Sequence, residues 1–178
     1  MMKLRARFLL LTLSLTIFFT VHISAKTSSS VGEKIPNFKL KNIEDKNIKL
    51  HKVIEGKIAV INFTTTWCSD CKKLKKVLKP IIPEYKEKGV EFCYIYIGKG
   101  QKKRVLQEMK KGNRNNGVTK LFDENRQAAI RMKITKIPHL YIVDKKGIIR
   151  YEGLCLEKKG ITEEIEKVLK MGGSEWGS

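Results

Sequence analysis

The chain of 178 residues is short of acidic side chains, with 18 Asp and Glu against 37 Lys and Arg and a formal net charge of +19. The basic residues are scattered along the whole sequence, and neither an aromatic platform nor a recognised nucleic-acid motif accompanies them. This pattern argues against nucleic acid as a partner. It indicates a generally cationic surface, which would be weakly attracted to acidic partners and to anionic membrane surfaces.

Long apolar runs are also lacking. The longest, Phe8 to about Val21, spans some fourteen residues, whereas a helix that crosses a membrane needs roughly 20. Three basic residues precede this run, and small or polar residues follow it up to Ala25. That order predicts a secretory signal peptide over residues 1–25, with an uncleaved anchor as the alternative, and therefore a periplasmic or other extracytoplasmic location.

The remainder of the chain is expected to form one domain. Loss of residues 1–25 removes three basic and no acidic side chains, which leaves 34 basic against 18 acidic and a charge of +16. The serine-rich stretch 26–33 predicts a flexible leader, and residues 172–178 predict a flexible tail. Residues 34–171, which contain no internal repeat, are then a single domain of ordinary size.

Apolar patterning predicts an α/β domain with a mixed central sheet flanked by helices. Continuous apolar runs at 57–64 and 90–97 are typical of strands buried on both faces. Apolar residues at three- and four-residue steps predict a helix over 69–88, which Pro80 and Pro83 should kink or divide. Two further helices are expected at about 101–111 and at 162–171.

Turn signals complete this outline. A short hairpin is expected from 35 to 50, ahead of the main sheet, and a second from 138 to 151. Residues 112–117 have the composition of a loop, and Asp123 should cap a short helix that runs through Met132.

Cysteine is scarce, and only two of the four lie close together. Cys68 and Cys71 form a C-x-x-C motif between a buried strand and a helix. The first sulfur then lies at the helix N-terminus, where unpaired N–H groups and the helix dipole favour a reactive thiolate. The second lies on the same helix face and can displace a mixed disulfide. The motif therefore predicts thiol-disulfide exchange, which needs no cofactor.

Functions other than exchange are also conceivable for this chain. A zinc site needs four ligands in paired spacing, and His51, Cys93, His139 and Cys155 show none, so no metal site is predicted. A carrier of copper or another soft metal could use Cys68 and Cys71, with His139 as a third ligand. A catalytically idle adaptor that uses the cationic surface is a further alternative.

Several motifs resemble a known family. WCSDCKK after a buried strand, with IPHLYIVDKKGIIRYEG some seventy residues later, resembles the thioredoxin superfamily. VGEKIPNFKL and VINFTTTWC resemble the extracytoplasmic reductases of the TlpA/ResA type. The resemblance covers about Val31 to Leu169. It implies a thioredoxin fold with an N-terminal β-hairpin extension, and a monomer that exchanges disulfides with protein substrates and draws electrons from a membrane donor.

The resemblance also implies roles for individual residues. Cys68 is the nucleophile and Cys71 the resolving cysteine. Trp67 shields the site, and Pro138 is a cis-proline that faces the pair, with Ile137 before it.

Three positions depart from common patterns. Asn62 stands where cytoplasmic thioredoxins have a buried aspartate, as is usual in the TlpA/ResA branch. Leu74 replaces an acidic residue that this branch often has, which would leave proton transfer at Cys71 to water or another group. His139 follows the cis-proline and is expected to be a partly exposed strand residue rather than a partner of the sulfurs.

The dipeptide Ser69-Asp70 between the cysteines bears on the redox potential. Asp70 places a negative charge near the sulfurs and disfavours the thiolate. Four lysines at 72, 73, 75 and 76 act in the opposite direction, but they are expected to be solvated and screened. The pair is therefore predicted to be a reductant or a moderate oxidant. Cys93 and Cys155 are interpreted as small apolar residues, with a disulfide between them as the alternative.

Overall fold

A computed structural model describes residues 30–111, 117–154 and 157–173. The predicted signal peptide, residues 26–29 of the predicted leader, most of the predicted loop at 112–117, Cys155 and the end of the predicted tail lie outside the described residues. No helix within these three ranges has both the length and the apolar character of a membrane span.

The sheet has seven strands in the order β2-β1-β5-β4-β3-β6-β7. Strands β3, β4 and β5 run parallel, whereas β6, β7 and the β1–β2 hairpin pair antiparallel with their neighbours. The mixed sheet and the N-terminal hairpin are confirmed. The strands are β1 (Lys39–Lys41), β2 (Asn47–Lys49), β3 (Ile58–Thr64), β4 (Val90–Ile97), β5 (Val118–Asp123), β6 (His139–Val143) and β7 (Ile149–Gly153).

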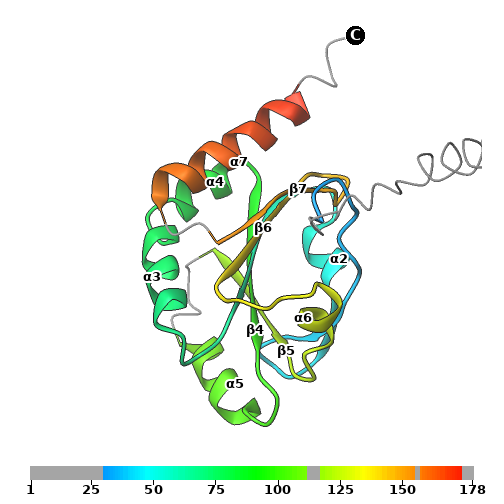
Figure 1. Cartoon of the computed structure of the whole chain (residues 1–178), viewed down its shortest axis with the longest axis vertical. Helices are drawn as coiled ribbons and strands as arrows, with labels where there is room; N and C mark the ends of the chain where they lie inside the picture. Colours follow the sequence, from blue (N-terminus) through cyan, green and yellow to red (C-terminus); the bar gives the residue numbers. More distant parts are fainter. Residues whose placement is uncertain (1–29, 112–116, 155–156, 174–178) are drawn as a thin grey trace, which may run out of the picture.

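Helices cover both faces of the sheet (Figure 1). One face packs against α3 (Ser69–Leu78), α4 (Ile82–Glu87), α5 (Lys102–Lys110) and α7 (Lys158–Gly173). The other packs against α2 (Leu50–Ile54), α6 (Gln127–Arg131) and the N-terminal segment before β1. Each face therefore has its own hydrophobic cluster, and the parallel strands are buried from both sides.

The unit formed by β3 and α3 positions the two cysteines. All seven residues of β3 are buried, as its apolar, β-branched sequence predicts. After β3 the chain bends at Thr66 and Trp67, is extended again at Cys68, and enters α3 at Ser69. This helix ends at Leu78, and α4 begins at Ile82 with a proline in its first turn, so the two prolines divide the predicted helix.

The main departure from the predicted elements is β5. Its sequence contains Lys120, a residue that is depleted in buried strands. The structure accommodates it because the Lys120 ammonium donates to the carbonyl oxygens of Met109 and Lys111 at the end of α5, at 2.9 and 2.6 Å. The Lys120 side chain thus caps the C-terminus of α5, and its ammonium is hydrogen-bonded even though the residue is buried in β5.

The ends of two helices also bear on the predictions. As expected, the Asp123 carboxylate accepts a hydrogen bond from the Ala129 N–H, at 2.9 Å, beside the start of α6. Burial raises the pKa of this carboxyl, although backbone N–H groups of α6 oppose the shift. Helix α7 begins four residues before the predicted helix and continues to Gly173.

Candidate active site

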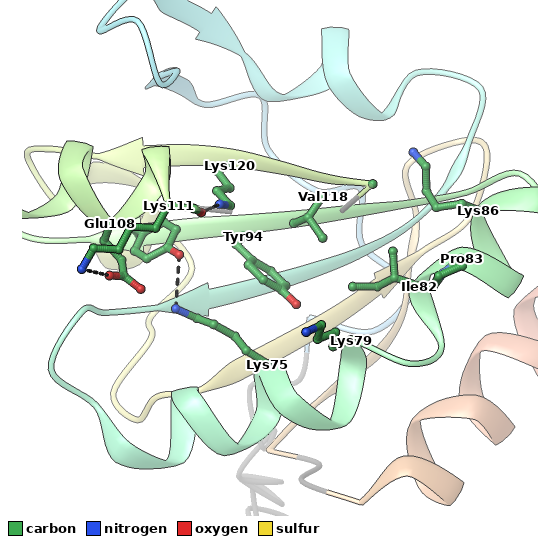
Figure 2. Close-up of a pocket in the computed structure, with 12 residues that line it drawn as sticks. Lys75, Lys79, Ile82, Pro83, Lys86, Tyr94, Glu108, Lys111, Val118 and Lys120 are labelled. Atoms are coloured by element: carbon green, nitrogen blue, oxygen red, sulfur yellow. Dashed lines mark hydrogen bonds and ion pairs between the residues drawn. The ribbon is translucent and has the colours of Figure 1, made fainter. Parts of the chain in front are cut away.

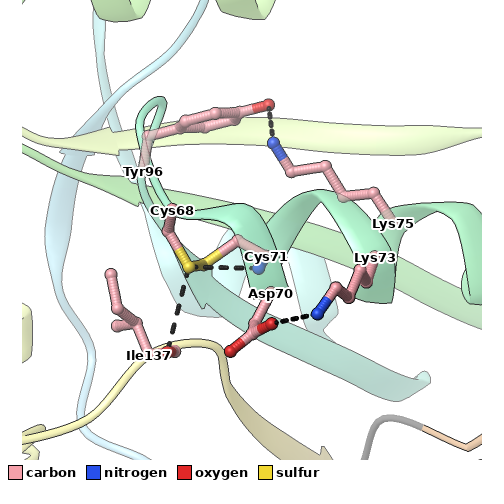
Figure 3. The surroundings of a disulfide bond; sticks show 7 residues. All are labelled: Cys68, Asp70, Cys71, Lys73, Lys75, Tyr96 and Ile137. Carbon is pink, nitrogen blue, oxygen red and sulfur yellow. Dashed lines mark hydrogen bonds and ion pairs between the residues drawn. A yellow bond between two sulfur atoms is a disulfide. The ribbon is translucent and has the colours of Figure 1, made fainter.

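Cys68 and Cys71 lie at the junction of β3 and α3, joined as a disulfide, with 5.2 Å between their Cα atoms (Figure 3). Cys68 is the N-cap residue of α3, and Cys71 lies in its first turn. Cys68 is 8% exposed, whereas Cys71 is fully buried. The sulfur of Cys68 is therefore the one that a partner can reach.

The start of α3 supplies a hydrogen-bond donor to the outer sulfur. The Cys71 N–H donates to Cys68 Sγ at 3.0 Å. This N–H is one of the donors that have no partner within the helix. In the reduced protein, the same donor and the helix dipole would stabilise a Cys68 thiolate.

The remaining predicted site residues gather around the disulfide. The Ile137–Pro138 peptide bond is cis, as the resemblance implies. The Ile137 carbonyl oxygen lies 3.9 Å from Cys68 Sγ, and Pro138 is buried. Trp67 is 57% exposed, and with Ile137 it lines an open cavity of about 340 Å³ beside the cysteines. Ser69 is exposed at the start of α3.

The charge beside the sulfurs is partly compensated. Asp70 forms an exposed ion pair with Lys73, whose ammonium lies 2.9 Å from the carboxylate (Figure 3). One turn beyond Cys71, Lys75 is half-buried, and its ammonium donates to the Tyr96 hydroxyl at 3.2 Å. The expectation that Lys75 is solvated is wrong, because the two tyrosines of β4 cover it.

Buried polar groups precede the cysteines. Asn62, Thr64, Thr65 and Thr66 are buried, and their side-chain polar atoms have no hydrogen-bond partner within the part of the chain that the structure describes. Leu74 is buried on the side of the sheet that α3 covers, and its hydrocarbon side chain cannot exchange a proton. The hydroxyls of the run Thr64–Thr66 are not among the site residues that the motifs predict, although three consecutive hydroxyl residues between a buried strand and a cysteine are visible in the sequence.

The His139 side chain contacts Glu152 and Tyr141 and not the cysteine pair. Its Nε2 lies 3.2 Å from Glu152 Oε1, and its ring stacks at 4.8 Å on Tyr141. The structure thus places it as a partly buried strand residue with a carboxylate partner. Among the described residues, no three His, Cys, Asp or Glu side chains are grouped as metal ligands, so His139 does not join the two cysteines in a ligand set.

Cys93 belongs to the opposite side of the sheet. It is fully buried in β4, within the cluster that packs against α2 and α6. Burial raises the pKa of its thiol, and the nearby Glu91 charge adds to the shift. The expectation that Cys93 is a small apolar residue is confirmed, and the thiol is free and inaccessible to a partner.

Comparison with known proteins shows to which family the chain belongs. The AhpC/TSA family matches residues 31–152. The chain belongs to this family. ResA, a thiol-disulfide oxidoreductase of Bacillus subtilis (strain 168), is 30% identical over 139 residues, which cover 78% of this chain and 75% of that protein. A protein of the same name from Bacillus thuringiensis (strain Al Hakam) is 38% identical over 86 residues, an alignment that spans 47% of this chain and 49% of that protein.

Solved structures of other proteins support the thioredoxin fold that the sequence predicts for this AhpC/TSA family member. A putative thiol:disulfide interchange protein DsbE from Chlorobium tepidum superposes with a TM-score of 0.66 at 19% identity, covering 78% of this chain and 97% of that one. The thioredoxin fold is therefore confirmed. With its C-x-x-C pair at the start of α3, the family member is a thiol-disulfide oxidoreductase.

Proposed function

We propose that the protein is exported and that it reduces disulfides in protein substrates, with Cys68 as nucleophile and Cys71 as resolving cysteine. The observation that carries this assignment is the difference in exposure between the two sulfurs, together with the N–H donor at Cys68. An attacking thiolate must be reached by a partner, whereas a resolving thiol needs only to reach the mixed disulfide.

The exchange balances as follows. The Cys68 thiolate attacks one sulfur of a substrate disulfide and forms a mixed disulfide, while the other substrate sulfur leaves as a thiolate. The Cys71 thiol loses its proton and attacks Cys68 Sγ, which releases the second substrate thiolate and forms the Cys68–Cys71 disulfide. Two electrons pass from the protein to the substrate. A dithiol donor in the membrane would return them.

The surroundings of the pair suit a protein substrate. The Ile137 carbonyl, the exposed Trp67 ring and the open cavity between them lie beside the reachable sulfur. An extended segment of a substrate could lie across this surface and place its disulfide at Cys68. Since the contacts needed are local, we propose that the protein acts as a monomer.

The direction of electron flow rests on the reduction potential. Asp70 disfavours the thiolate and supports a reducing couple, although its ion pair with Lys73 offsets part of that effect. We expect titration against glutathione to give a potential below about −180 mV, the value typical of disulfide isomerases. A higher potential would rule out the reductant role and leave the exchange chemistry intact.

Export rests on the first 25 residues. Basic residues, a short apolar run and a small-residue end predict that protein from an exporting host begins at or near Lys26. N-terminal sequencing of the exported protein tests this. Membrane-bound protein that retains Met1 would establish the anchor, and protein that remains in the cytoplasm would contradict export.

A further inference from the structure

A second cavity lies on the α3 side of the sheet, beyond the disulfide. It measures about 540 Å³ and is bounded by α3, α4, α5 and the strands β4 and β5. Figure 2 shows Lys75 on α3, Lys79 just after it, Ile82 at the start of α4 and Val118 on β5 around Tyr94. Neither cysteine of the redox pair lines it. Its size is within the range of small-molecule sites, about 300–1,000 Å³.

The floor of this cavity is apolar. Ile82 and Tyr94 are largely buried members of the hydrophobic cluster on this face, and Val118 packs against that cluster. Pro83 adds an apolar edge at the start of α4. A ligand here would place an apolar body against this floor and remove it from water.

The rim of the cavity carries more positive charge than the described side chains around it balance. Five lysines line the cavity, and Glu108 is the single acidic residue among its lining side chains. Three of the lysines already have partners: Lys86 with Glu91, Lys111 with Glu108, and Lys120 with backbone carbonyls. Lys75 on α3 and Lys79, the C-cap residue that follows α3, form no ion pair with any of the described carboxylates.

Of these two lysines, Lys75 provides the stronger evidence for an anion site. Its ammonium is held by the Tyr96 hydroxyl, and it lies 4.6 Å from the centre of the Tyr96 ring. Burial lowers the pKa of this amine. Glu108 is the acidic group whose charge acts on this amine, but Glu108 forms its ion pair with Lys111. The half-buried Lys75 ammonium therefore has only the neutral Tyr96 hydroxyl as a hydrogen-bond partner and would be stabilised by an anion.

We propose that this cavity binds a small amphipathic anion, with its apolar body on Ile82, Tyr94 and Val118 and its acidic head between Lys75 and Lys79. A medium-chain carboxylate combines the two properties. The proposal is independent of thiol-disulfide exchange, because the cavity is lined by neither Cys68 nor Cys71.

Calorimetric titration of the purified protein with decanoate tests the site. We expect decanoate to bind more tightly than decanol and decyltrimethylammonium, each used below its micelle concentration. In a series from butyrate to decanoate, the dissociation constant should fall two- to fourfold per added CH₂, where fourfold corresponds to about 0.8 kcal/mol. The fall should level off once the cavity is filled. Equal binding of decanol, or an affinity that does not depend on chain length, would overturn the proposal.

Variants of α3 separate this site from general surface charge. Lys75→Met keeps the apolar stem, removes the charge and should weaken decanoate binding about tenfold, with a smaller loss for Lys79→Met. Lys76→Met is the matched control, since Lys76 is exposed on the same helix and does not line the cavity. Equal losses in Lys75→Met and Lys76→Met would overturn the site. If Lys75→Met does not fold, Lys79→Met and the chain-length series on the unmodified protein decide.

Discussion

Within the described residues, a buried polar side chain is hydrogen-bonded at the amino end of the parallel strands, whereas buried polar side chains at the carboxyl end of β3 have no partner. At the amino end, the buried Glu91 of β4 has three partners: Lys86 at 2.9 Å, Lys57 at 3.5 Å and the Thr119 hydroxyl at 2.8 Å. At the carboxyl end of β3, the side-chain polar atoms of Asn62 and Thr64 are just as buried, and nothing in the described residues hydrogen-bonds to them. The cysteine pair lies at this second end.

The difference separates a structural cluster from a reactive site. A buried carboxylate is tolerated when its charge and its lone pairs are matched, so the Glu91 cluster fixes β3, β4 and β5 at one end. A buried hydroxyl or amide without a partner costs free energy. Asn62 and Thr64, on the strand that leads to Cys68, therefore do not contribute to stability in the way that the Glu91 cluster does.

The largest expected effect is at the reactive end. Cys68→Ser should reduce disulfide reductase activity to the background rate, because the attacking sulfur is gone. Cys71→Ser should leave a protein that attacks substrates and retains them as mixed disulfides, since no resolving thiol remains. Insulin reduction and non-reducing gels measure the two outcomes. Mixed disulfides on Cys68→Ser instead would reverse the assigned roles, and activity in both variants would contradict the site.

The next largest effect is expected at the amino end of the strands, where Glu91 is buried. Glu91→Gln preserves shape but leaves Lys86 and Lys57 without their carboxylate. Because both lysines are partly exposed, we expect a loss of about 2 kcal/mol in the free energy of unfolding rather than the larger cost of a fully buried pair. Urea unfolding measures it. Glu84→Gln is the control, since Glu84 pairs with Lys88 on the surface and should change stability by no more than about 0.5 kcal/mol. Equal effects would remove the distinction between the two carboxylates.

A matched pair of threonine variants compares the two ends directly. Thr119→Val removes a hydrogen bond to Glu91 and should lower the free energy of unfolding by about 1–2 kcal/mol. Thr64→Val makes the same change where the hydroxyl has no partner in the described residues, so stability should stay constant or rise by up to about 1 kcal/mol. If Thr64→Val destabilises the fold as much as Thr119→Val, the contrast between the two ends fails.

Sequence patterning predicted the elements whose burial matches their composition. β3 and β4 are continuous apolar runs, and the helix after Cys68 has a clear apolar period with two prolines at its division. β5 was missed because its lysine reaches helix carbonyls that lie close only in the folded chain. A single-sequence pattern scores such a lysine as solvent-exposed.

The site shows the same division between local and long-range information. The cysteine spacing and its strand-to-helix context are local, so the sequence was sufficient to select Cys68 and Cys71. The cover of Lys75 by the tyrosines of β4 and the pairing of His139 with Glu152 depend on neighbouring strands. Only the register of the folded sheet brings these side chains together.

The smallest expected effect concerns the charge of Asp70, which is exposed to solvent beside the sulfurs. Asp70→His removes a negative charge near the N-terminus of α3 and, when protonated, adds a positive one, so it should stabilise the Cys68 thiolate and raise the reduction potential. One pKa unit in the thiolate corresponds to about 30 mV for this two-electron couple. Because solvent and Lys73 already screen Asp70, we expect a rise of about 10–30 mV in titrations against glutathione. Lys73→Met should shift the potential the other way, since it leaves the carboxylate uncompensated. Shifts of the same sign in both variants would show that groups other than this ion pair control the potential.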